Sequence, residues 1–330
     1  MVSARTLVTG ATGGIGQVLV SRLLAEGREV AVTGRNTTRG AGLSRLGAEF
    51  LAADLVTDDL STIVRGADTI FHLAALSSPW GPRETFVAAN EIATERLISA
   101  ARLAGCRRFI FASTPSIYTR AAHQIGLTET SPVPGRPVNA YAQTKLNAER
   151  RVLASATPEF ATLALRPRAV ISPYDTVLLP RLLHAARQGL MPLPGHGRTL
   201  IEPTDARDVC SAFLAAEQRC ETLSGEAFNI SGGEPIELRT LASHVFDRLG
   251  RRVRFVPLSS HLTLGLAHFA EAGAKLRPQS GEPALTVYSA LALGWSQTFN
   301  LESARARLGW SPQFSPRTAI DWALEERRHA

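Results

Sequence analysis

Short apolar runs and helical repeats alternate along the first half of the chain. Between the runs, apolar side chains recur at the spacing of a helix, as at Val18, Leu19, Leu23 and Leu24. Strands that alternate with helices predict an α/β protein with a parallel, doubly wound sheet. The runs that we interpret as buried strands span residues 5–9, 29–33, 49–52, 69–75 and 107–112.

The pattern becomes less regular beyond about Leu178, where Pro and Gly cluster between Met191 and Gly197. We therefore expect a Rossmann-type nucleotide-binding domain over residues 1–177 and a smaller C-terminal substrate-capping domain over most of residues 178–330.

The stretch from Val256 to Leu276 is apolar but interrupted by charged residues and histidines, so it lacks a charge-free span of membrane length. We expect an amphipathic helix over a pocket, and a peripheral membrane contact through its apolar face stays open. Its large apolar residues could line the pocket or form core: they are Leu262, Leu264, Leu266 and Phe269.

Composition and charge exclude several classes of protein. A 330-residue chain with 45% hydrophobic and 20% charged residues is typical of a soluble globule, and its net charge of +7 comes without a long basic run. We expect a solvated positive surface that favours anionic small ligands, and no nucleic-acid partner. Cys106, Cys210 and Cys220 lack metal-ligand spacing, and residues 1–4 leave no room for a signal peptide. These features predict a cytoplasmic protein without a metal or a transmembrane segment.

A glycine-rich turn follows the first predicted strand and precedes the first helix. It reads Gly10-Ala11-Thr12-Gly13-Gly14-Ile15-Gly16. Glycines in this context allow a tight turn and close approach of backbone amides to a pyrophosphate, which the helix N-terminus attracts. The sequence therefore predicts a dinucleotide cofactor.

The second strand ends in Gly34-Arg35-Asn36, where an NAD-selective site usually has an acidic residue for the ribose hydroxyls. Arg35 can instead bind a 2′-phosphate, so we expect NADP(H) in preference to NAD(H).

Tyr141 and Lys145 lie four residues apart in a predicted helix, so their side chains share one helical face. A phenol with an ordinary pKa near about 10 exchanges protons poorly at neutral pH unless a cation such as Lys145 favours the phenolate. The strand 107–112 delivers Ser113, Thr114 and Ser116 to its carboxyl end, where ligands of open α/β sheets bind. A hydroxyl there can hold the substrate oxygen, which predicts hydride-transfer chemistry on a carbonyl or an alcohol.

We expect three other polar residues to have structural roles and not catalytic or ligand-binding ones. His72 lies in a nearly continuous apolar run, so we expect a satisfied core histidine rather than a ligand. Asp205 and Asp208 open a predicted helix, so we expect N-caps rather than catalysts.

Taken together, these motifs resemble the extended short-chain dehydrogenases/reductases of the NAD(P)-dependent epimerase/dehydratase superfamily. The resemblance covers about the first half of the chain, in the expected order. It rests on Thr9-Gly10-x-x-Gly13-x-x-Gly16, Asp54-Leu55, His72-Leu73-Ala74-Ala75, Ser113-Thr114-x-x-x-Tyr118, Tyr141-x-x-x-Lys145 and Leu165-Arg166-Pro167.

The resemblance implies that Tyr141 is the acid/base and that Lys145 holds the nicotinamide ribose and lowers the tyrosine pKa. It also implies that a Ser or Thr hydroxyl orients the substrate oxygen, and counting back from Tyr118 in the motif assigns this role to Thr114. Ser113 and Ser116 stay candidates for that last role because Pro115 follows Thr114. The implied cofactor-binding set is Gly10, Thr12, Gly13, Gly14, Ile15, Gly16, Arg35, Asn36, Asp54, Leu55, Leu73, Ala74, Ala75, Lys145, Pro167 and Val170.

Family topology also implies that segments near 200–216 and 227–230 return to the first domain, and that helices 84–104 and 139–154 form the dimerising pair of a homodimer.

This chain lacks residues that are typical of two other branches of the family, the dehydratases and the epimerases. Dehydratases of the family carry Asp and Glu where this chain has Pro115 and Ser116, and epimerases usually have an asparagine after the Arg-Pro strand, where this chain has no asparagine. The segments 131–141 and 297–305 are similar to the 3β-hydroxysteroid-dehydrogenase-like and 2-alkyl-3-oxoalkanoate reductase branch. We expect an oxidoreductase that acts on an apolar carbonyl or secondary alcohol, such as a 3-oxoacyl or steroid-like compound. The alternatives are a nucleotide-sugar epimerase and a non-catalytic NADP-sensing protein.

Overall fold

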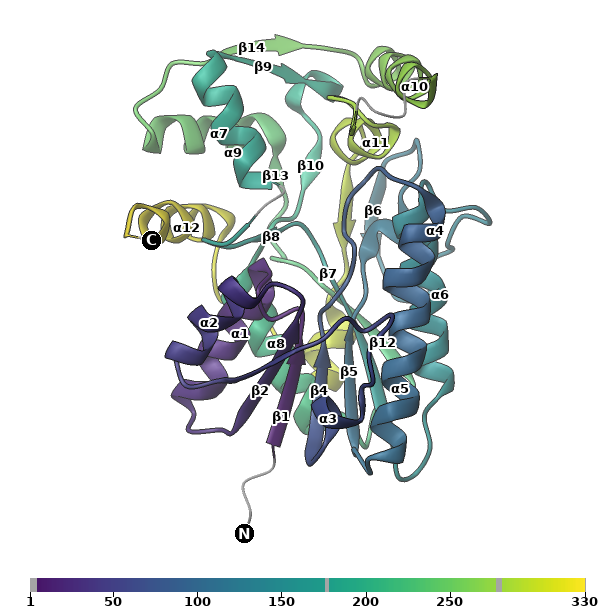
Figure 1. Cartoon of the computed structure of the whole chain (residues 1–330). Coiled ribbons are helices and arrows are strands. Elements are labelled where there is room, and N and C mark those ends of the chain that lie inside the picture. Colours follow the sequence, from purple (N-terminus) through teal and green to yellow (C-terminus); the bar gives the residue numbers. More distant parts are fainter. Residues whose placement is uncertain (1–4, 176–177, 277–280, 330) are drawn as a thin grey trace.

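A seven-stranded parallel sheet forms the centre of the lower part of the molecule in Figure 1. The computed structural model describes residues 5–175, 178–276 and 281–329. The strand order is β12-β7-β5-β4-β1-β2-β3, so the crossover connections run outwards in both directions from the centre. The strands are β1 (Arg5–Thr9), β2 (Val30–Gly34), β3 (Glu49–Ala52), β4 (Ala67–His72), β5 (Arg108–Ala112), β7 (Ala161–Pro167) and β12 (Glu226–Ile230).

Alternate residues of each strand enter different hydrophobic cores. Val8 packs beneath α1 (Gly14–Ala25), α2 (Thr37–Arg45) and α8 (Ala206–Arg219), whereas Leu7 packs beneath α3 (Ser61–Val64), α5 (Ala93–Leu103) and α6 (Ala140–Ala154). Helices therefore cover both faces, which explains the continuous apolar runs of the strands. The predicted doubly wound α/β fold is confirmed.

Two predicted elements differ in detail from the elements that the structure shows. The run 69–75 leaves the sheet after His72, because Leu73 and Ala74 turn across the end of β1, where their amides bond to the Thr9 carbonyl and hydroxyl oxygens. The predicted helix 84–104 consists of α4 (Arg83–Phe86), a π-helical segment (Val87–Ile92) and α5.

A second core lies in the upper part of Figure 1. Leu182, Leu241 and Ile320 are among the side chains that hold its helices together. Its elements are α7 (Leu178–Gln188), β9 (Leu190–Leu193), β14 (Arg254–Pro257), α9 (Leu238–Arg248) and α12 (Pro316–His329).

Short strand pairs connect the two parts. They are β8 (Val170–Ile171) with β11 (Thr204–Asp205), β10 (Leu200–Ile201) with β13 (Ile236–Glu237), and β6 (Gln124–Leu127) with β15 (Gln297–Phe299). The expected absence of a leader at residues 1–4 lies outside the described residues, as do the last two residues before the expected domain boundary after residue 177.

The helix α10 (Ser260–Leu276) packs against α11 (Val287–Gly294) through small side chains. Thr263 and Ala267 are buried, whereas Leu262, Leu266 and Phe269 are 54%, 47% and 80% exposed. Most of the large apolar residues in this stretch therefore belong neither to a core nor to an enclosed pocket. Within the described residues, no helix is long and apolar enough to cross a membrane.

Candidate active site

The glycine turn forms a tight cradle at the carboxyl end of β1. Gly10 has a φ of +68°, and a Cβ there would lie 2.6 Å from the Ala74 amide nitrogen. A Cβ on Gly16 would lie 2.4 Å from the Gly10 carbonyl oxygen. Gly13 caps α1 without a side-chain hydrogen bond, and the first turn of α1 holds no acidic residue. The amides of this helix end are thus open to an anion, and the cradle fits a dinucleotide pyrophosphate.

The ends of β2 and β3 meet beside this cradle. Arg35 is 80% exposed, and its Nη1 lies 3.7 Å from Asp54 Oδ2. Asn36 accepts a hydrogen bond from the Arg39 amide and so caps α2. Leu55 packs against the core below. An adenosine ribose at this edge would therefore face a guanidinium.

The proposed catalytic hydroxyls meet at the carboxyl ends of the central strands. Asn139 caps α6 and places Tyr141 in its first turn. Thr114, the residue that caps the short 3₁₀ helix Pro115–Tyr118, interacts with the Tyr141 phenol. Burial raises the pKa of Tyr141 to about 12, and the interaction with Thr114 partly opposes this rise. The phenol is therefore neutral at pH 7 and is a proton donor.

The three candidate hydroxyls occupy different positions. Ser113 Oγ is buried without a hydrogen-bond partner in the described part of the chain. Thr114 Oγ1 donates to Ser116 Oγ at 2.9 Å, and Ser116 Oγ lies 2.8 Å from the Tyr288 hydroxyl. Thr114, Ser116 and Tyr288 thus form one hydrogen-bonded series, and Thr114 at its end interacts with Tyr141. Ser113 lies outside this series.

Lys145 lies one turn beyond Tyr141 and is 2% exposed. Its Nζ is 3.9 Å from the centre of the Phe111 ring. Burial lowers the pKa of Lys145 to about 7, and the charge of Glu149 opposes this effect. Glu149 is itself occupied by Arg166, whose Nε and Nη2 donate to it at 2.8 and 2.6 Å. The lysine therefore lies in an apolar site without an ion-pair partner within 4 Å among the described residues.

Three residues that the sequence reasoning missed support this arrangement. Asn90, in the π-helical segment, bonds to the amide and carbonyl groups of Leu76 and to the Thr144 hydroxyl, so it connects the loop after β4 to α6. An asparagine inside an otherwise apolar helical stretch was a signal for it. Tyr288, whose hydroxyl lies 2.8 Å from Ser116 Oγ, and Arg168, which interacts electrostatically with Tyr288, join the site only through the tertiary fold.

The structure tests the structural roles that were predicted for His72, Asp205 and Asp208. His72 is fully buried and bonds to Thr9 and Thr94 hydroxyls, and burial lowers its pKa to about 3, so the predicted core role is confirmed. Asp205 caps α8 as predicted. The cap prediction is wrong for Asp208, whose carboxylate accepts the amides of Gln313 and Phe314 and fixes the C-terminal segment.

The model of the NAD dependent epimerase/dehydratase family matches residues 6–231. The chain belongs to this family. Family members named "Uncharacterized protein YbjS" of Escherichia coli (strain K12) and "2-alkyl-3-oxoalkanoate reductase" of Stenotrophomonas maltophilia (strain K279a) are 35% and 34% identical. The first match covers 93% of both chains, and the second covers 94% of this chain and 96% of the relative.

A solved structure of the same fold is "MoeE5 in complex with UDP-glucuronic acid and NAD", with a TM-score of 0.77 and 25% identity over 99% of this chain and 100% of that one. The extended short-chain dehydrogenase/reductase resemblance is thus confirmed, with a fold that binds NAD(P) and an enzyme family of dehydrogenases and reductases.

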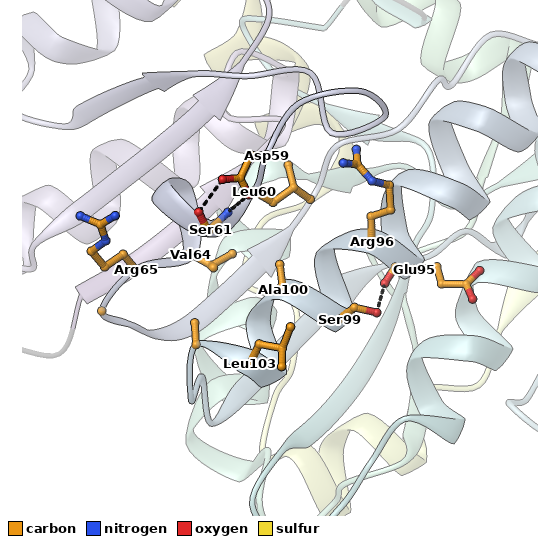
Figure 2. Close-up of a pocket in the computed structure, with 12 residues that line it drawn as sticks. Asp59, Leu60, Ser61, Val64, Arg65, Glu95, Arg96, Ser99, Ala100 and Leu103 are labelled. Carbon is orange, nitrogen blue, oxygen red and sulfur yellow. Dashed lines mark hydrogen bonds between the residues drawn. The ribbon is translucent and has the colours of Figure 1, made fainter.

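A surface hollow of about 720 Å³ lies away from these groups (Figure 2). Its lining comes from residues 59–66 and 95–104, which precede β4 and β5. It therefore lies towards the amino edge of the sheet, opposite the edge that carries Thr114, and is not the reaction site.

Proposed function

We propose that the protein is an NADP(H)-dependent oxidoreductase that reduces a carbonyl, or oxidises a secondary alcohol, on an apolar substrate such as a 3-oxoacyl or steroid-like compound. The observation that carries this proposal is the interaction of the Tyr141 phenol with Thr114, with Lys145 buried one helical turn away. A proton donor, a second hydroxyl and a titratable cation at the carboxyl edge of the sheet are the groups that carbonyl reduction requires.

Each residue has a distinct task in this mechanism. A bound nicotinamide supplies or accepts the hydride. Tyr141 donates its proton to the oxygen that develops negative charge, and Thr114 holds that oxygen in place. Lys145 holds the nicotinamide ribose and, when protonated, stabilises the phenolate that remains.

The proposed preference for NADP(H) rests on Arg35. The Arg35 side chain is 80% exposed and has room to turn from Asp54 to a phosphate, and Arg39 in the first turn of α2 adds a second exposed cation. A 2′-phosphate would bind to these cations, and the end of β2 has no acidic residue at the position where an NAD-selective site usually carries one for the ribose hydroxyls.

The substrate class follows from the reductase name of a full-length relative and from the absent dehydratase acids at Pro115 and Ser116. A nucleotide-sugar epimerase is the second candidate, favoured by the likeness to a structure that holds a UDP-sugar. A sensor that binds NADP without turnover is the third.

A panel of substrates separates the candidates. Purified protein is mixed with NADPH and ketones or 3-oxo acids of increasing chain length, and the loss of NADPH absorbance is followed. We expect turnover on apolar carbonyls. Interconversion of UDP-glucose and UDP-galactose without added cofactor would identify an epimerase, and cofactor binding without any turnover would identify a sensor.

We also propose that the protein is a cytoplasmic homodimer that pairs through α5 and α6. The two helices pack side by side, joined by the bond of Arg151 to Glu95 at 2.7 Å, and both present outer faces. Leu103 is 91% exposed beside the hollow of Figure 2, and a second copy would cover it.

A further inference from the structure

The helix α10 exposes a row of large apolar side chains on one face. Leu262, Leu266, Phe269 and Leu276 are 54%, 47%, 80% and 86% exposed. They follow one another at intervals of four, three and seven residues, so they share one face of the helix. The other exposed large apolar side chains of the described residues are scattered singly along the chain. This apolar row of α10 therefore marks a surface that binds an apolar partner.

A different side of α10 attaches the helix to the rest of the protein. Thr263 and Ala267 are buried, and α10 packs against α11. Glu271, four residues beyond Ala267, accepts the Val287 amide at 2.7 Å. The contacts of α10 with the fold thus use small and polar side chains. Substitutions in the apolar row should therefore leave the fold intact.

Positive charge lies beside the apolar row. Three exposed side chains follow one flank of it at intervals of seven residues: His261, His268 and Lys275. The strand β14 lies with α10 at the top of Figure 1, and this strand and the turn before it contain three exposed arginines: Arg251, Arg252 and Arg254. None of the arginines, nor Lys275, has a carboxylate of the described residues within 4 Å. Between residues 251 and 276 the sequence contains one carboxylate, Glu271, and it is held at α11.

The charges decide between possible occupants of the apolar row. A second copy of the chain would bring the same basic surface against this one, which is unfavourable. An anionic lipid bilayer offers acyl chains to the apolar side chains and phosphates to the cations, and helices of this composition bind at such an interface.

The C-terminal end of α10 lies beside the proposed active site. Lys275 Nζ is 6.0 Å from the centre of the Trp80 ring. The carbonyl of Pro79, the preceding residue, accepts the side-chain amide of Asn139 at 3.2 Å. Asn139 caps the helix that carries Tyr141. One loop therefore connects α10 to the start of the catalytic helix.

A second connection runs through α11. Glu271 holds the Val287 amide, and the hydroxyl of the next residue, Tyr288, lies 2.8 Å from Ser116 Oγ. A surface that binds α10 would thus lie next to the elements that form the proposed site.

We propose that α10 is an interfacial helix that binds this protein to an anionic lipid bilayer, with the apolar row among the acyl chains and the cations at the lipid phosphates. Docking in this way places the proposed active site at the membrane surface, where an apolar substrate is concentrated. The docking is independent of the proposed reductase function, whereas delivery of the substrate from the lipid rests on it.

Binding is measured by sedimentation of the full chain with vesicles of phosphatidylcholine, alone or with about 30% phosphatidylglycerol. We expect the anionic vesicles to bind at least about 10-fold tighter than the neutral ones, and less tightly in high salt. Phe269→Asp should weaken binding to the anionic vesicles by at least about 10-fold, because it replaces a ring in contact with acyl chains by a charge. The matched control is Leu46→Asp, at a 59% exposed leucine that ends α2, and it should leave binding unchanged.

Three results of these measurements would overturn the docking. They are the absence of binding to either kind of vesicle, equal binding of Phe269→Asp and the unaltered protein, and equal losses in Phe269→Asp and Leu46→Asp. Light scattering without lipid adds a fourth, since a fall from dimer to monomer mass in Phe269→Asp would assign the apolar row to a second copy of the chain.

A fluorescent label tests whether the apolar row enters the acyl chains. The three native cysteines are buried, so a polarity-sensitive label can be attached at Leu266→Cys and, as the control, at Leu46→Cys. Emission from the first label should rise on anionic vesicles and be quenched by lipids brominated in their acyl chains, whereas the second label should not respond. An unresponsive label at position 266 would mean that charge alone holds the protein at the surface, which would overturn the insertion.

Turnover separates the docking from the proposed function. A long-chain ketone carried in anionic vesicles is compared with a short water-soluble ketone, each with NADPH. Phe269→Asp should lower the rate on the vesicle-bound ketone by about 10-fold and leave kcat on the soluble ketone unchanged. An unchanged rate on the vesicle-bound ketone would overturn delivery from the lipid. No turnover of either ketone would end the proposed reductase function, while the sedimentation result would still decide the docking.

Discussion

The protonation of Lys145 offers the most direct test of how this site is built. The side chain is 2% exposed, and the carboxylate nearest in sequence, Glu149, is held by Arg166. Its pKa falls from 10.5 to about 7 because burial disfavours the ammonium form. At about 1.4 kcal/mol per pKa unit, this difference corresponds to roughly 5 kcal/mol against the charged form in the folded chain.

The sign of the resulting pH dependence follows from linkage. Below pH 7 both the folded and the unfolded chain carry the proton, and the folded chain bears the full cost. Between pH 7 and 10.5 the folded chain has released the proton while the unfolded chain still binds it, so the cost shrinks as the pH rises. Lys145→Met should therefore raise the free energy of unfolding by up to about 5 kcal/mol at pH 6 and by only about 1 kcal/mol at pH 9.5.

The chain itself supplies a sensitive assay, since it contains only two lysines, Lys145 and Lys275. In Lys275→Met protein labelled at the lysine ε position, a single NMR resonance reports Lys145. We expect it to titrate near pH 7 without cofactor. Urea unfolding of Lys145→Met at pH 6 and 9.5, with Lys275→Met as the matched exposed control, measures the stability difference.

Two results would refute this reasoning. A Lys145 resonance that titrates at 10.5 or above would mean that the ammonium is stabilised in the folded chain, not penalised. A Lys145→Met protein less stable than the original at pH 6 would mean that the contact of the ammonium with the Phe111 ring outweighs the cost of burial.

The remaining predictions concern the phenol, the cofactor and the assembly. Tyr141→Phe should lower kcat by 10²- to 10⁴-fold while the Kd for NADPH, measured by fluorescence, changes by less than about 3-fold; retained turnover would exclude the acid/base role. Arg35→Ala should weaken NADPH binding by roughly 10-fold or more and leave NADH nearly unchanged, and equal losses would discard the 2′-phosphate assignment. Light scattering of the unaltered protein at micromolar concentration should give the mass of a dimer, and the mass of a monomer would contradict the proposed pairing. Leu103→Glu should shift the measured mass towards that of a monomer.

Much of the fold could be predicted because its signals are local. The apolar runs 5–9 and 49–52 coincide with β1 and β3, and Asn139 begins the helix of Tyr141 and Lys145 by capping it. The predictions failed in detail where a contact between residues far apart in the chain competed with a local preference. The run 69–75 ends as a strand at His72 because Gly10 lets Leu73 and Ala74 cross above it, and Asp208 binds a segment that is more than 100 residues away in the chain.

The chain alone determined the sheet, the glycine turn after β1 and the placement of Tyr141 and Lys145 one helical turn apart, because glycine geometry and helical spacing act between neighbours. Only the tertiary structure decided which hydroxyl interacts with the phenol and that the Nε of Arg168, one of two nearby buried arginines, has no hydrogen-bond partner among the described residues. Burial and electrostatic pairing depend on all the groups that surround a side chain. Here Tyr288 comes from a helix more than 140 residues beyond Tyr141, so no local pattern could reveal it.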